Sequence, residues 1–307
     1  KAASDLGERT KNAEIAFFGG SFTAIDRTYM LSLLDATKKF RDKFCGIRIS
    51  TRPDYINKEI LKRLKKYKVK TIELGVQSAN NYILNRAERG HTFEDVKKAS
   101  KLIRWYGFNL GHQMMVGLPD STRIDEINTA KALIKLKPKM VRIYPVLVIK
   151  GTQLEKDYES GEYTPLTVEQ AVETAKDLLV LFNKKKINVI RIGLQNTNEI
   201  TDPNAKKSQV VAGPYHPAFR QLVESRLWYD NIANEIKKVN SNVTHIQIDV
   251  NPSDINNAVG HKRINIEKIN DTYNTDLKIN PNSKIKKGKL KITKLIKYQE
   301  FIKENVK

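Results

Sequence analysis

The sequence has one cysteine, Cys45, among its 307 residues. A single thiol cannot form a disulfide framework, and no cysteine-based metal site can be assembled from this chain alone. These absences exclude the disulfide-rich secreted class and the zinc-finger class. Cys45 is expected to be a small residue of the core.

Long hydrophobic runs and a leading signal peptide are also absent. No apolar run approaches the roughly 18 residues that a membrane span needs, and the first residues do not have the charged-then-apolar pattern of a secretion signal. We therefore expect a globular, cytoplasmic protein that does not span a membrane.

Acidic residues are few relative to basic ones. The chain has 34 Asp and Glu against 55 Lys and Arg, which gives a formal charge of +21. Such an excess favours a polyanionic partner, either nucleic acid or an anionic membrane surface. A lysine-rich but merely solvated surface would give the same composition, so composition leaves both readings open.

Apolar runs of strand length alternate with helical patterns in the first half of the chain. Strands are expected over 15–18, 46–50, 71–75, 110–116 and 140–149, and helices over 27–43, 58–66, 93–105 and 124–136. Strands separated by helices of this length predict parallel βαβ units and an α/β fold.

The pattern changes after residue 151. A capping box of Thr167 and Gln170 predicts a helix over 167–186, and the string "INVIRIGLQ" predicts a further strand. Residues 196–214 are polar and are interpreted as a linker. A helix over 217–239, a strand over 244–250, two helices, a strand over 275–279 and a basic terminal strand over 284–297 follow. This predicts two domains, 1–195 and a smaller α+β domain 196–307.

Several of the predicted parallel strands end in glycine or polar residues. Gly19 and Gly20 follow the first strand, and Glu73, Gln77 and Arg89 lie within or shortly after the third. Ligands of parallel sheets bind at the carboxyl ends of the strands, where loops present free backbone groups. A glycine pair there is either a tight turn or a place where the backbone approaches a ligand closely.

Residues 13–161 resemble the radical SAM core of the Elongator catalytic subunit. The resemblance rests on the strings "FFGGSFT", "STRPDYI", "ELGVQS", "RGHT", "MMVGLPD" and "YPVLVIKGTQL" taken together. It implies a partial (β/α)6 barrel that binds S-adenosylmethionine (SAM) and a [4Fe-4S] cluster, and that acts through a 5′-deoxyadenosyl radical.

The resemblance also assigns roles to individual residues. The glycine pair would receive the methionine amino group of SAM, and Gln77 with Arg89 would hold the same ligand, an Arg fork being suited to a carboxylate. The full set implied as cofactor-binding is Gly19, Gly20, Ser50, Arg52, Gln77, Arg89, Met115, Val116, Leu147 and Val148. The apolar members would flank adenine or else belong to the core. His91 is expected to order its loop.

One departure from the family concerns the cluster. The three-cysteine CxxxCxxC motif that supplies its ligands, together with the first barrel strand, is not in this sequence. We expect either an enzyme truncated at its N-terminus or a degenerate paralogue. In either case this chain is expected to be inactive by itself, unable to bind the cluster, weak in SAM binding, and unpaired at the N-terminal edge of its sheet. The full-length protein would carry the cluster and need an electron donor.

The C-terminal segment "AVGHKRINIEKINDTYNTDLKI" resembles the GxxG region of KH domains, whose loop contacts the nucleic-acid backbone. Arg263 stands where the second glycine would be. The residues expected to contact RNA, preferably tRNA, are Gly260, His261, Lys262, Arg263, Lys287, Lys289 and Lys291; a solvated loop is the alternative. The segment "VVAGPYHPAFRQLVESRLWYD" resembles the shorter bacterial relatives of the Elongator subunit, which implies that no acetyltransferase domain is to be expected. The sequence thus leaves two main functions open, a tRNA-modifying radical SAM enzyme in fragment form and a noncatalytic RNA-binding protein, with radical chemistry on another substrate less favoured.

Overall fold

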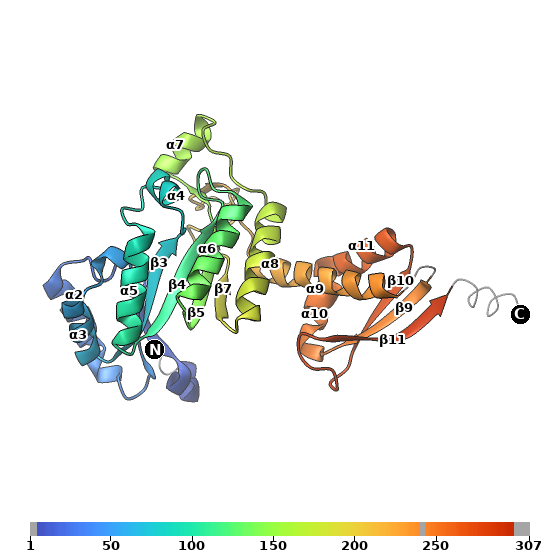
Figure 1. Cartoon of the computed structure of the whole chain (residues 1–307), viewed down its shortest axis with the longest axis horizontal. Helices are drawn as coiled ribbons and strands as arrows, with labels where there is room; N and C mark the ends of the chain where they lie inside the picture. The colour runs from blue at the N-terminus through green and yellow to red at the C-terminus, as the bar shows by residue number, and fades with distance from the viewer. Residues whose placement is uncertain (1–4, 240–242, 298–307) are drawn as a thin grey trace, which may run out of the picture. The chain divides into compact units, whose positions relative to one another are not determined.

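A computed structural model of the chain describes residues 5–239 and 243–297 (Figure 1). Its contacts divide the chain into unit 1, Lys1–Tyr215, and unit 2, His216–Lys307. The domain boundary at residue 195 stays a prediction. No helix of the described residues is long and apolar enough to cross a bilayer.

Unit 1 is built on a six-stranded parallel sheet. In spatial order its strands are β1 (Glu14–Phe17), β2 (Gly46–Thr51), β3 (Val69–Gln77), β4 (Asn109–Val116), β5 (Met140–Pro145) and β7 (Asn188–Ile192). The two end strands, β1 and β7, do not pair with each other, so the sheet is a curled half-barrel. This confirms the predicted α/β fold. Among the described residues β1 pairs only with β2, as expected for an open N-terminal edge.

Helices connect the strands and cover one face of the sheet. They are α2 (Arg27–Ala36), α3 (Lys58–Lys66), α4 (Asn81–Arg86), α5 (Phe93–Trp105), α6 (Arg123–Lys135), α7 (Gln153–Glu159) and α8 (Val168–Lys184), with short 3-10 segments at Gly7–Asn12, Lys38–Phe40 and Pro53–Tyr55. Thr92, Thr122 and Thr167 each form a capping box, which explains why these helices begin where they do.

The two faces of the sheet differ because side chains alternate along each strand. Apolar residues such as Ile49, Leu74 and Ile143 are fully buried in the core of unit 1. Glu14, Arg48 and Glu73 occupy intervening strand positions and hydrogen-bond to one another. The inner face of the half-barrel is therefore polar.

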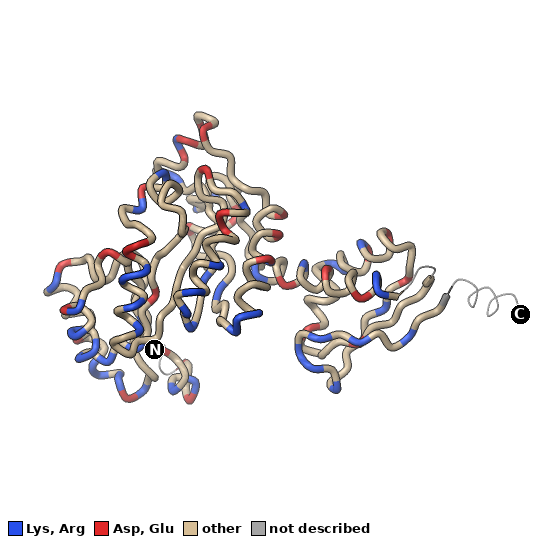
Figure 2. The backbone as a smooth tube through the Cα atoms, viewed as in Figure 1, with Lys and Arg blue, Asp and Glu red and all other residues tan. Residues whose placement is uncertain are grey.

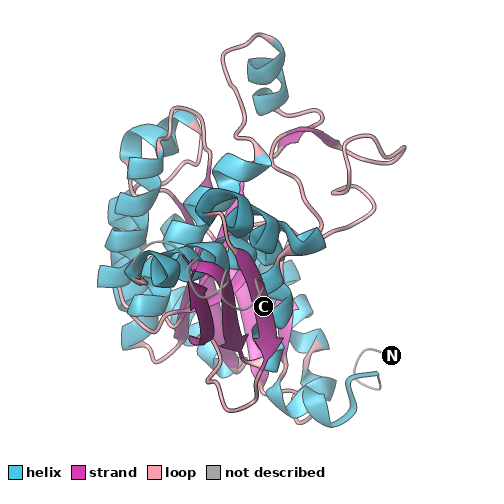
Figure 3. Ribbon diagram, turned by 90° about the vertical axis from the view of Figure 1, so that its right-hand side faces the viewer, coloured by secondary structure: helices cyan, strands magenta, loops and turns pink. Residues whose placement is uncertain are grey.

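Three sequence expectations in unit 1 were wrong. The strand expected over 140–149 ends at Pro145, which has no N–H to continue the ladder, and a separate β6 (Val148–Ile149) follows. The segment 196–214 is not merely a linker, since its β8 (Val210–Ala212) pairs antiparallel with β6, apart from the main sheet (Figure 3). The helix expected over 27–43 ends at Ala36, where the Thr37 hydroxyl donates to the Leu34 carbonyl.

Unit 2 is a two-layer α+β fold. Its helices α9 (Phe219–Lys238), α10 (Ile255–Val259) and α11 (Ile264–Tyr273) lie along one face of a sheet ordered β10 (Asp276–Pro281), β9 (Val243–Val250), β11 (Leu290–Lys297) (Figure 3). Short 3-10 segments occur at Pro252–Asp254 and His261–Arg263. Trp228, Ile232, Ile248 and Ile269 belong to its core.

The basic strand expected over 284–297 begins only at Leu290. The preceding residues form a loop because their backbone hydrogen-bonds elsewhere. Gly288 N–H donates to Asp254 Oδ2 at 2.7 Å, and the Asn251 side chain donates to the Ile285 carbonyl at 2.8 Å. These two contacts tie the loop to the corner between β9 and α10.

Candidate functional site

The loops that follow β1 and β2 are joined by hydroxyl groups. Ser21 Oγ lies 2.8 Å from Thr51 Oγ1 and accepts the Arg52 N–H at 3.0 Å, while Thr23 Oγ1 lies 2.6 Å from the same Thr51 oxygen. Phe22 N–H donates to the Ser50 carbonyl at 3.0 Å. The segments "GGSFT" and "STRPDYI" are thus hydrogen-bonded to each other at the carboxyl end of the sheet.

Gly19 and Gly20 need the backbone freedom of glycine. Their φ angles are +104° and +151°, in a region that L side chains rarely adopt. A Cβ built at either position would meet nothing within 4 Å. Both glycines are exposed, so their backbone borders open space in which a ligand can approach.

Arg52 is held in place by its neighbours. Its guanidinium makes a bidentate pair with Asp54, at 3.0 and 2.7 Å, and donates to the Gly90 carbonyl at 2.7 Å. It also lies over the Tyr55 ring. Because a Cβ on Gly90 would come within 2.8 Å of this guanidinium, the glycine of "RGHT" makes room for Arg52.

The end of β3 places Gln77 and His91. Gln77 has φ +68° and folds back over Gly75, where an added Cβ would lie 2.9 Å from Gln77 Nε2. His91 Nε2 lies 3.2 Å from the Val76 carbonyl and Nδ1 lies 3.2 Å from that of Arg89. Burial lowers the pKa of His91. His91 therefore orders its loop, as expected.

Arg89 lies beside a pocket of about 300 Å³. Its Nε is buried and has no hydrogen-bond partner among the described residues. Burial, and then the neighbouring charge of Arg52, lower the pKa of Arg89. The pocket is lined by Arg86, Ala87, Glu88, Arg89, Met115, Leu118, Pro119, Val146, Leu147, Ile149, Thr152, Gln153, Leu154 and Asp157. A half-buried cation whose buried Nε has unused donor capacity, beside a largely apolar hollow, is suited to an anionic group carried by an apolar ligand.

The structure brings together only some of the residues implied as cofactor-binding. Arg89, Met115 and Leu147 line one pocket, whereas Val116 and Val148 are 1% and 0% exposed and belong to the core. The lining of this pocket does not include Gly19, Gly20, Ser50, Arg52 or Gln77, which lie at or just after the carboxyl ends of β1, β2 and β3.

Two buried side chains fix the loop after β4. Glu126 accepts the Gly117 N–H at 2.6 Å and the Ser121 hydroxyl at 3.2 Å, and the Tyr163 hydroxyl donates to the Gly117 carbonyl at 2.7 Å. Burial raises the pKa of Glu126 to about 7 and that of Tyr163 to about 12. Gly117 directly precedes Leu118, which lines the pocket of Arg89.

A network of hydrogen-bonded polar side chains on the inner face of the half-barrel, here called the polar floor, was largely not predicted from the sequence. Glu73, 1% exposed, accepts from Arg48 at 2.5 Å, from Arg142 at 2.6 Å and from Gln113 at 3.0 Å. Gln113 also donates to Ser50 Oγ at 3.1 Å. Burial opposes ionisation, but the hydrogen bonds from Arg142, Arg48 and Gln113 hold the pKa of Glu73 below its ordinary value. Charged residues at alternate positions of otherwise apolar strands are the signal that indicates such a floor.

Unit 2 presents the predicted RNA loop between α10 and α11. Gly260 has φ +79°, and a Cβ there would lie 2.9 Å from Ile264 Cγ2 and 3.0 Å from Ser225 Oγ, so glycine is required. His261, Lys262 and Arg263 are exposed. Arg263 adopts φ +64°, the left-handed conformation that a glycine adopts without strain. Lys287 and Lys289 lie in the loop before β11 and Lys291 lies in β11.

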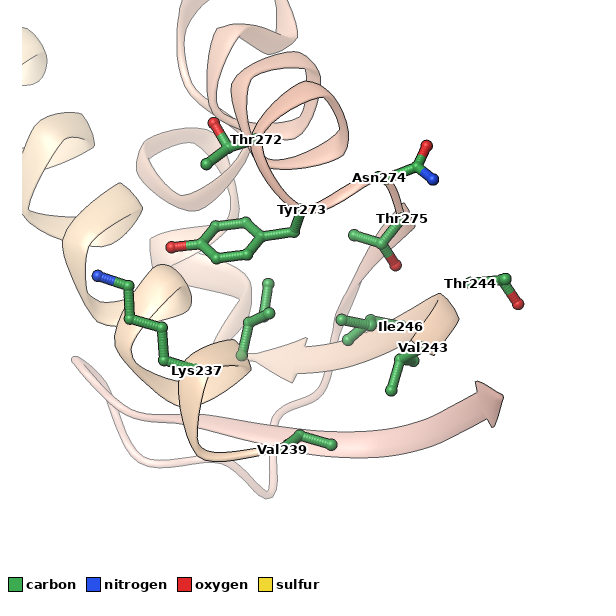
Figure 4. A pocket seen from close by; sticks show the side chains of 10 residues that line it. Lys237, Val239, Val243, Thr244, Ile246, Thr272, Tyr273, Asn274 and Thr275 are labelled. Atoms are coloured by element: carbon green, nitrogen blue, oxygen red, sulfur yellow. The ribbon is translucent and has the colours of Figure 1, made fainter. Parts of the chain in front are cut away.

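A separate hollow of about 650 Å³ lies in unit 2 (Figure 4). Figure 4 shows Tyr273 extending from the end of α11 toward the end of α9, where Lys237 lies. Thr275 Oγ1 on its wall is buried without a hydrogen-bond partner among the described residues. None of the predicted RNA-binding residues lines this hollow.

The described residues do not fit a [4Fe-4S] cluster. Cys45 directly precedes β2, at the amino end of the sheet and opposite the strand-end loops. No group of three or more His, Cys, Asp or Glu side chains in 5–239 and 243–297 is placed to hold a metal ion. No step through a cluster is therefore derived for this chain.

Comparisons with known proteins identify related families and structures. The family model of the radical SAM superfamily matches residues 1–133, and that of the radical SAM C-terminal domain matches 138–229. A tRNA uridine(34) acetyltransferase of Methanocaldococcus jannaschii is 33% identical over 190 residues, 55% of this chain and 35% of that protein. Elongator complex protein 3 of Homo sapiens is 29% identical over 198 residues, 57% of this chain and 36% of that protein.

A solved structure agrees with these sequence matches. The archaeal Methanocaldococcus infernus Elp3 with an N-terminal deletion aligns with a TM-score of 0.59 at 27% identity, over 72% of this chain and 54% of that chain. The chain thus spans little more than a third of the length of the two curated relatives. The parallel half-barrel and the two adjoining family matches agree: the chain belongs to the radical SAM superfamily and, within it, resembles the Elongator catalytic subunit.

Proposed function

We propose that unit 1 binds SAM at the carboxyl ends of β1 to β5, and that the chain is part of an enzyme that modifies tRNA. The observation that carries the proposal is the buried Nε of Arg89, which has no hydrogen-bond partner among the described residues and borders an apolar pocket. A ligand with a carboxylate at one end and a flat apolar ring at the other matches this combination.

Individual residues would divide the binding of SAM. Arg89 would pair with the carboxylate through its fork of donors, and the backbone of Gly19 and Gly20 would receive the amino group. Met115 and Leu147 would contact the adenine ring, since both line the pocket of Arg89. Arg52 is already paired with Asp54, so we assign it to positioning the Gly90 loop rather than to direct contact.

In this superfamily SAM bound to a reduced cluster supplies a 5′-deoxyadenosyl radical. Because the described residues offer no ligand set for the cluster, the proposal for this chain is confined to SAM binding. Inactivity of the chain by itself stays a prediction, as does the need for an electron donor.

The choice of tRNA as substrate rests on charge and on similarity. The chain carries a formal charge of +21, and one relative bears the name tRNA uridine(34) acetyltransferase. The exposed side chains of His261, Lys262 and Arg263 would contact a phosphate backbone. The alternative, a noncatalytic RNA-binding protein, shares these features and differs only in having no use for SAM.

Calorimetric titration separates these two functions. SAM should bind the chain with measurable heat, whereas ATP at the same concentration should not, because Arg89 and the apolar pocket are suited to an amino acid carboxylate joined to adenosine. Absence of SAM binding at millimolar concentration, in a sample that still binds tRNA, would favour the noncatalytic function.

A further inference from the structure

A groove of about 850 Å³ lies on the helical face of unit 1, away from the strand-end loops. It is formed by α5 together with the C-terminal end of α6, and its lining is Lys97, Lys98, Ser100, Lys101, Leu102, Arg104, Trp105, Lys135 and Leu136. We call it the α5–α6 groove. Trp105 lies four residues before the first residue of β4, so the groove is at the amino-end half of the sheet.

The α5–α6 groove is cationic. Five of its lining residues are Lys or Arg and none is acidic. Within the described part of the chain, Lys98, Lys101 and Lys135 have no carboxylate within ion-pair distance, whereas Lys97 pairs with Glu94 at 2.5 Å. Figure 2 shows basic residues toward the lower ends of α5 and α6 and acidic residues toward their upper ends.

Helix dipoles account for part of this charge only. Cations are favoured in the last turn of a helix, which explains Arg104 and Lys135. Lys98 and Lys101 lie earlier in α5, where the dipole effect has faded. After the hydrogen bonds of the capping box, the charge of Lys98 also helps to lower the pKa of Asp95, and the remaining excess of cations beside the groove is available to a polyanion.

Trp105 supplies a flat apolar surface beside these cations. It is 73% exposed, the largest value among the exposed large hydrophobic residues in the part of the chain that the structure describes. The neighbouring Tyr106 ring stands edge-on to it, with centroids 5.4 Å apart, and Arg104 donates to the Leu136 carbonyl at 3.5 Å. Exposed aromatic rings flanked by cations are how proteins bind single-stranded nucleic acid, through base stacking and phosphate contacts.

We propose that the α5–α6 groove is a docking site for an unpaired segment of RNA. A base stacks on Trp105, and Lys98, Lys101 and Lys135 contact the flanking phosphates. The groove lies on the helical face, whereas the SAM site is proposed at the strand ends, so it anchors RNA instead of presenting the nucleotide that reacts. This inference rests on the proposed function in taking tRNA as the substrate.

Gel-shift titrations of an unmodified tRNA transcript at several salt concentrations test the proposal. Trp105→Ala should weaken binding about tenfold, the effect of losing one stacked base, whereas Trp105→Phe should retain most of the affinity. The double variant Lys98→Glu/Lys101→Glu should lower the slope of log affinity against log salt by roughly 1.4. The matched control is Lys58→Glu/Lys62→Glu, two exposed lysines of α3 with the same change of charge.

The outcomes distinguish the groove from the proposed function. Wild-type protein that binds tRNA while Trp105→Ala binds equally well overturns the groove inference and leaves the tRNA function standing. An equal loss in the α3 control and the α5 variant shows a general charge effect and also overturns it. Wild-type protein with no tRNA affinity overturns both.

If Trp105→Ala leaves tRNA binding unchanged but abolishes self-association in sedimentation, the groove is an interface between copies and the inference is wrong. Unchanged thermal unfolding and SAM titration confirm that each variant is folded.

Discussion

Glu73 on β3 and Arg142 on β5 are hydrogen-bonded to each other across the intervening strand β4. Arg142 Nε donates to Glu73 Oε2 at 2.6 Å, and Nη2 donates to Oε1 at 3.1 Å. Gly111 on β4 lies beside Glu73 in the sheet register, and its lack of a side chain leaves room for the carboxylate stem. Arg48 binds the same carboxylate from the other side, so one buried anion links β2, β3 and β5.

Glu73→Gln should destabilise unit 1 by about 3 kcal/mol, because it leaves the guanidinium of Arg142 without its anion and leaves Arg48 with Glu14 as its remaining carboxylate partner. Urea unfolding of the two proteins at pH 7 measures the difference. The matched control is Glu59→Gln, which removes an exposed i,i+4 pair with Arg63 and should cost less than about 0.5 kcal/mol. Equal stability of the wild type and Glu73→Gln would mean that the polar floor does not hold the sheet together.

Gly111→Ala should cost about 1–3 kcal/mol through overpacking. The added Cβ would lie 2.8 Å from Glu73 Cγ and 3.2 Å from Met140 Cγ. If the Glu73 stem is what the methyl group displaces, the cost should fall markedly in a Glu73→Ala background, since residues in contact are not additive. A double-mutant cycle by urea unfolding provides the test, and strict additivity would contradict the described packing.

The stability of unit 1 should depend on pH through Glu126. Burial raises the pKa of this carboxyl from 4.5 to about 7, so the folded state holds the proton more tightly than the unfolded state. The resulting stabilisation is complete below pH 4.5 and is lost as the pH rises through 7, a change of about 3 kcal/mol. Glu126→Gln should lack this component.

His112 acts in the opposite direction. It is fully buried, and burial lowers its pKa to about 3, so its contribution is present above pH 6.5 and is lost as the pH falls. The difference in unfolding free energy between wild type and Glu126→Gln removes the His112 contribution, which both proteins share. The unfolding free energy of the wild type, relative to that of Glu126→Gln, should therefore decrease as the pH rises from 4.5 to 7. A difference independent of pH would show that folding does not raise the pKa of Glu126.

The loop between α10 and α11 should contribute to RNA affinity independently of the α5–α6 groove. Lys262→Glu/Arg263→Glu should weaken tRNA binding and lower the salt slope by roughly 1.4, with little loss of thermal stability, since both side chains are exposed. Lys268→Glu/Lys278→Glu, two exposed lysines elsewhere in unit 2, is the matched control. Equal effects of the two double variants would make this loop an ordinary solvated surface.

Local signals in the sequence were sufficient for much of the fold. The helices α3 and α5 begin and end at the predicted residues, and the side chains of Asn57 and Thr92 cap their first turns. The parallel order of the strands followed from the helices between them. The pairing of β6 with β8 was missed because a pairing with a distant segment has no local signal. The break at Pro145 does have one, the proline itself, which was not used.

Of the candidate site, the sequence predicted only the glycines and the polar residues at the ends of the strands. The network around Glu73 depends on the register of neighbouring strands, which brings Arg48, Gln113 and Arg142 within reach of one carboxylate. Likewise the pairing of Arg52 with Asp54, and the unused Nε of Arg89, follow from side-chain directions that a sequence pattern does not specify.

The most direct test of SAM binding is calorimetric titration of SAM into wild type, Arg89→Ala, Arg89→Lys and the control Arg104→Ala. Arg104 is an exposed arginine of α5 that does not line the pocket of Arg89. Arg89→Ala should lower the affinity at least about tenfold, the effect of losing a charged hydrogen bond to a carboxylate, and Arg89→Lys should restore only part of it because an ammonium lacks the planar fork. Arg104→Ala should bind as the wild type does. Equal SAM affinity in wild type and Arg89→Ala would contradict the assignment of this pocket to SAM.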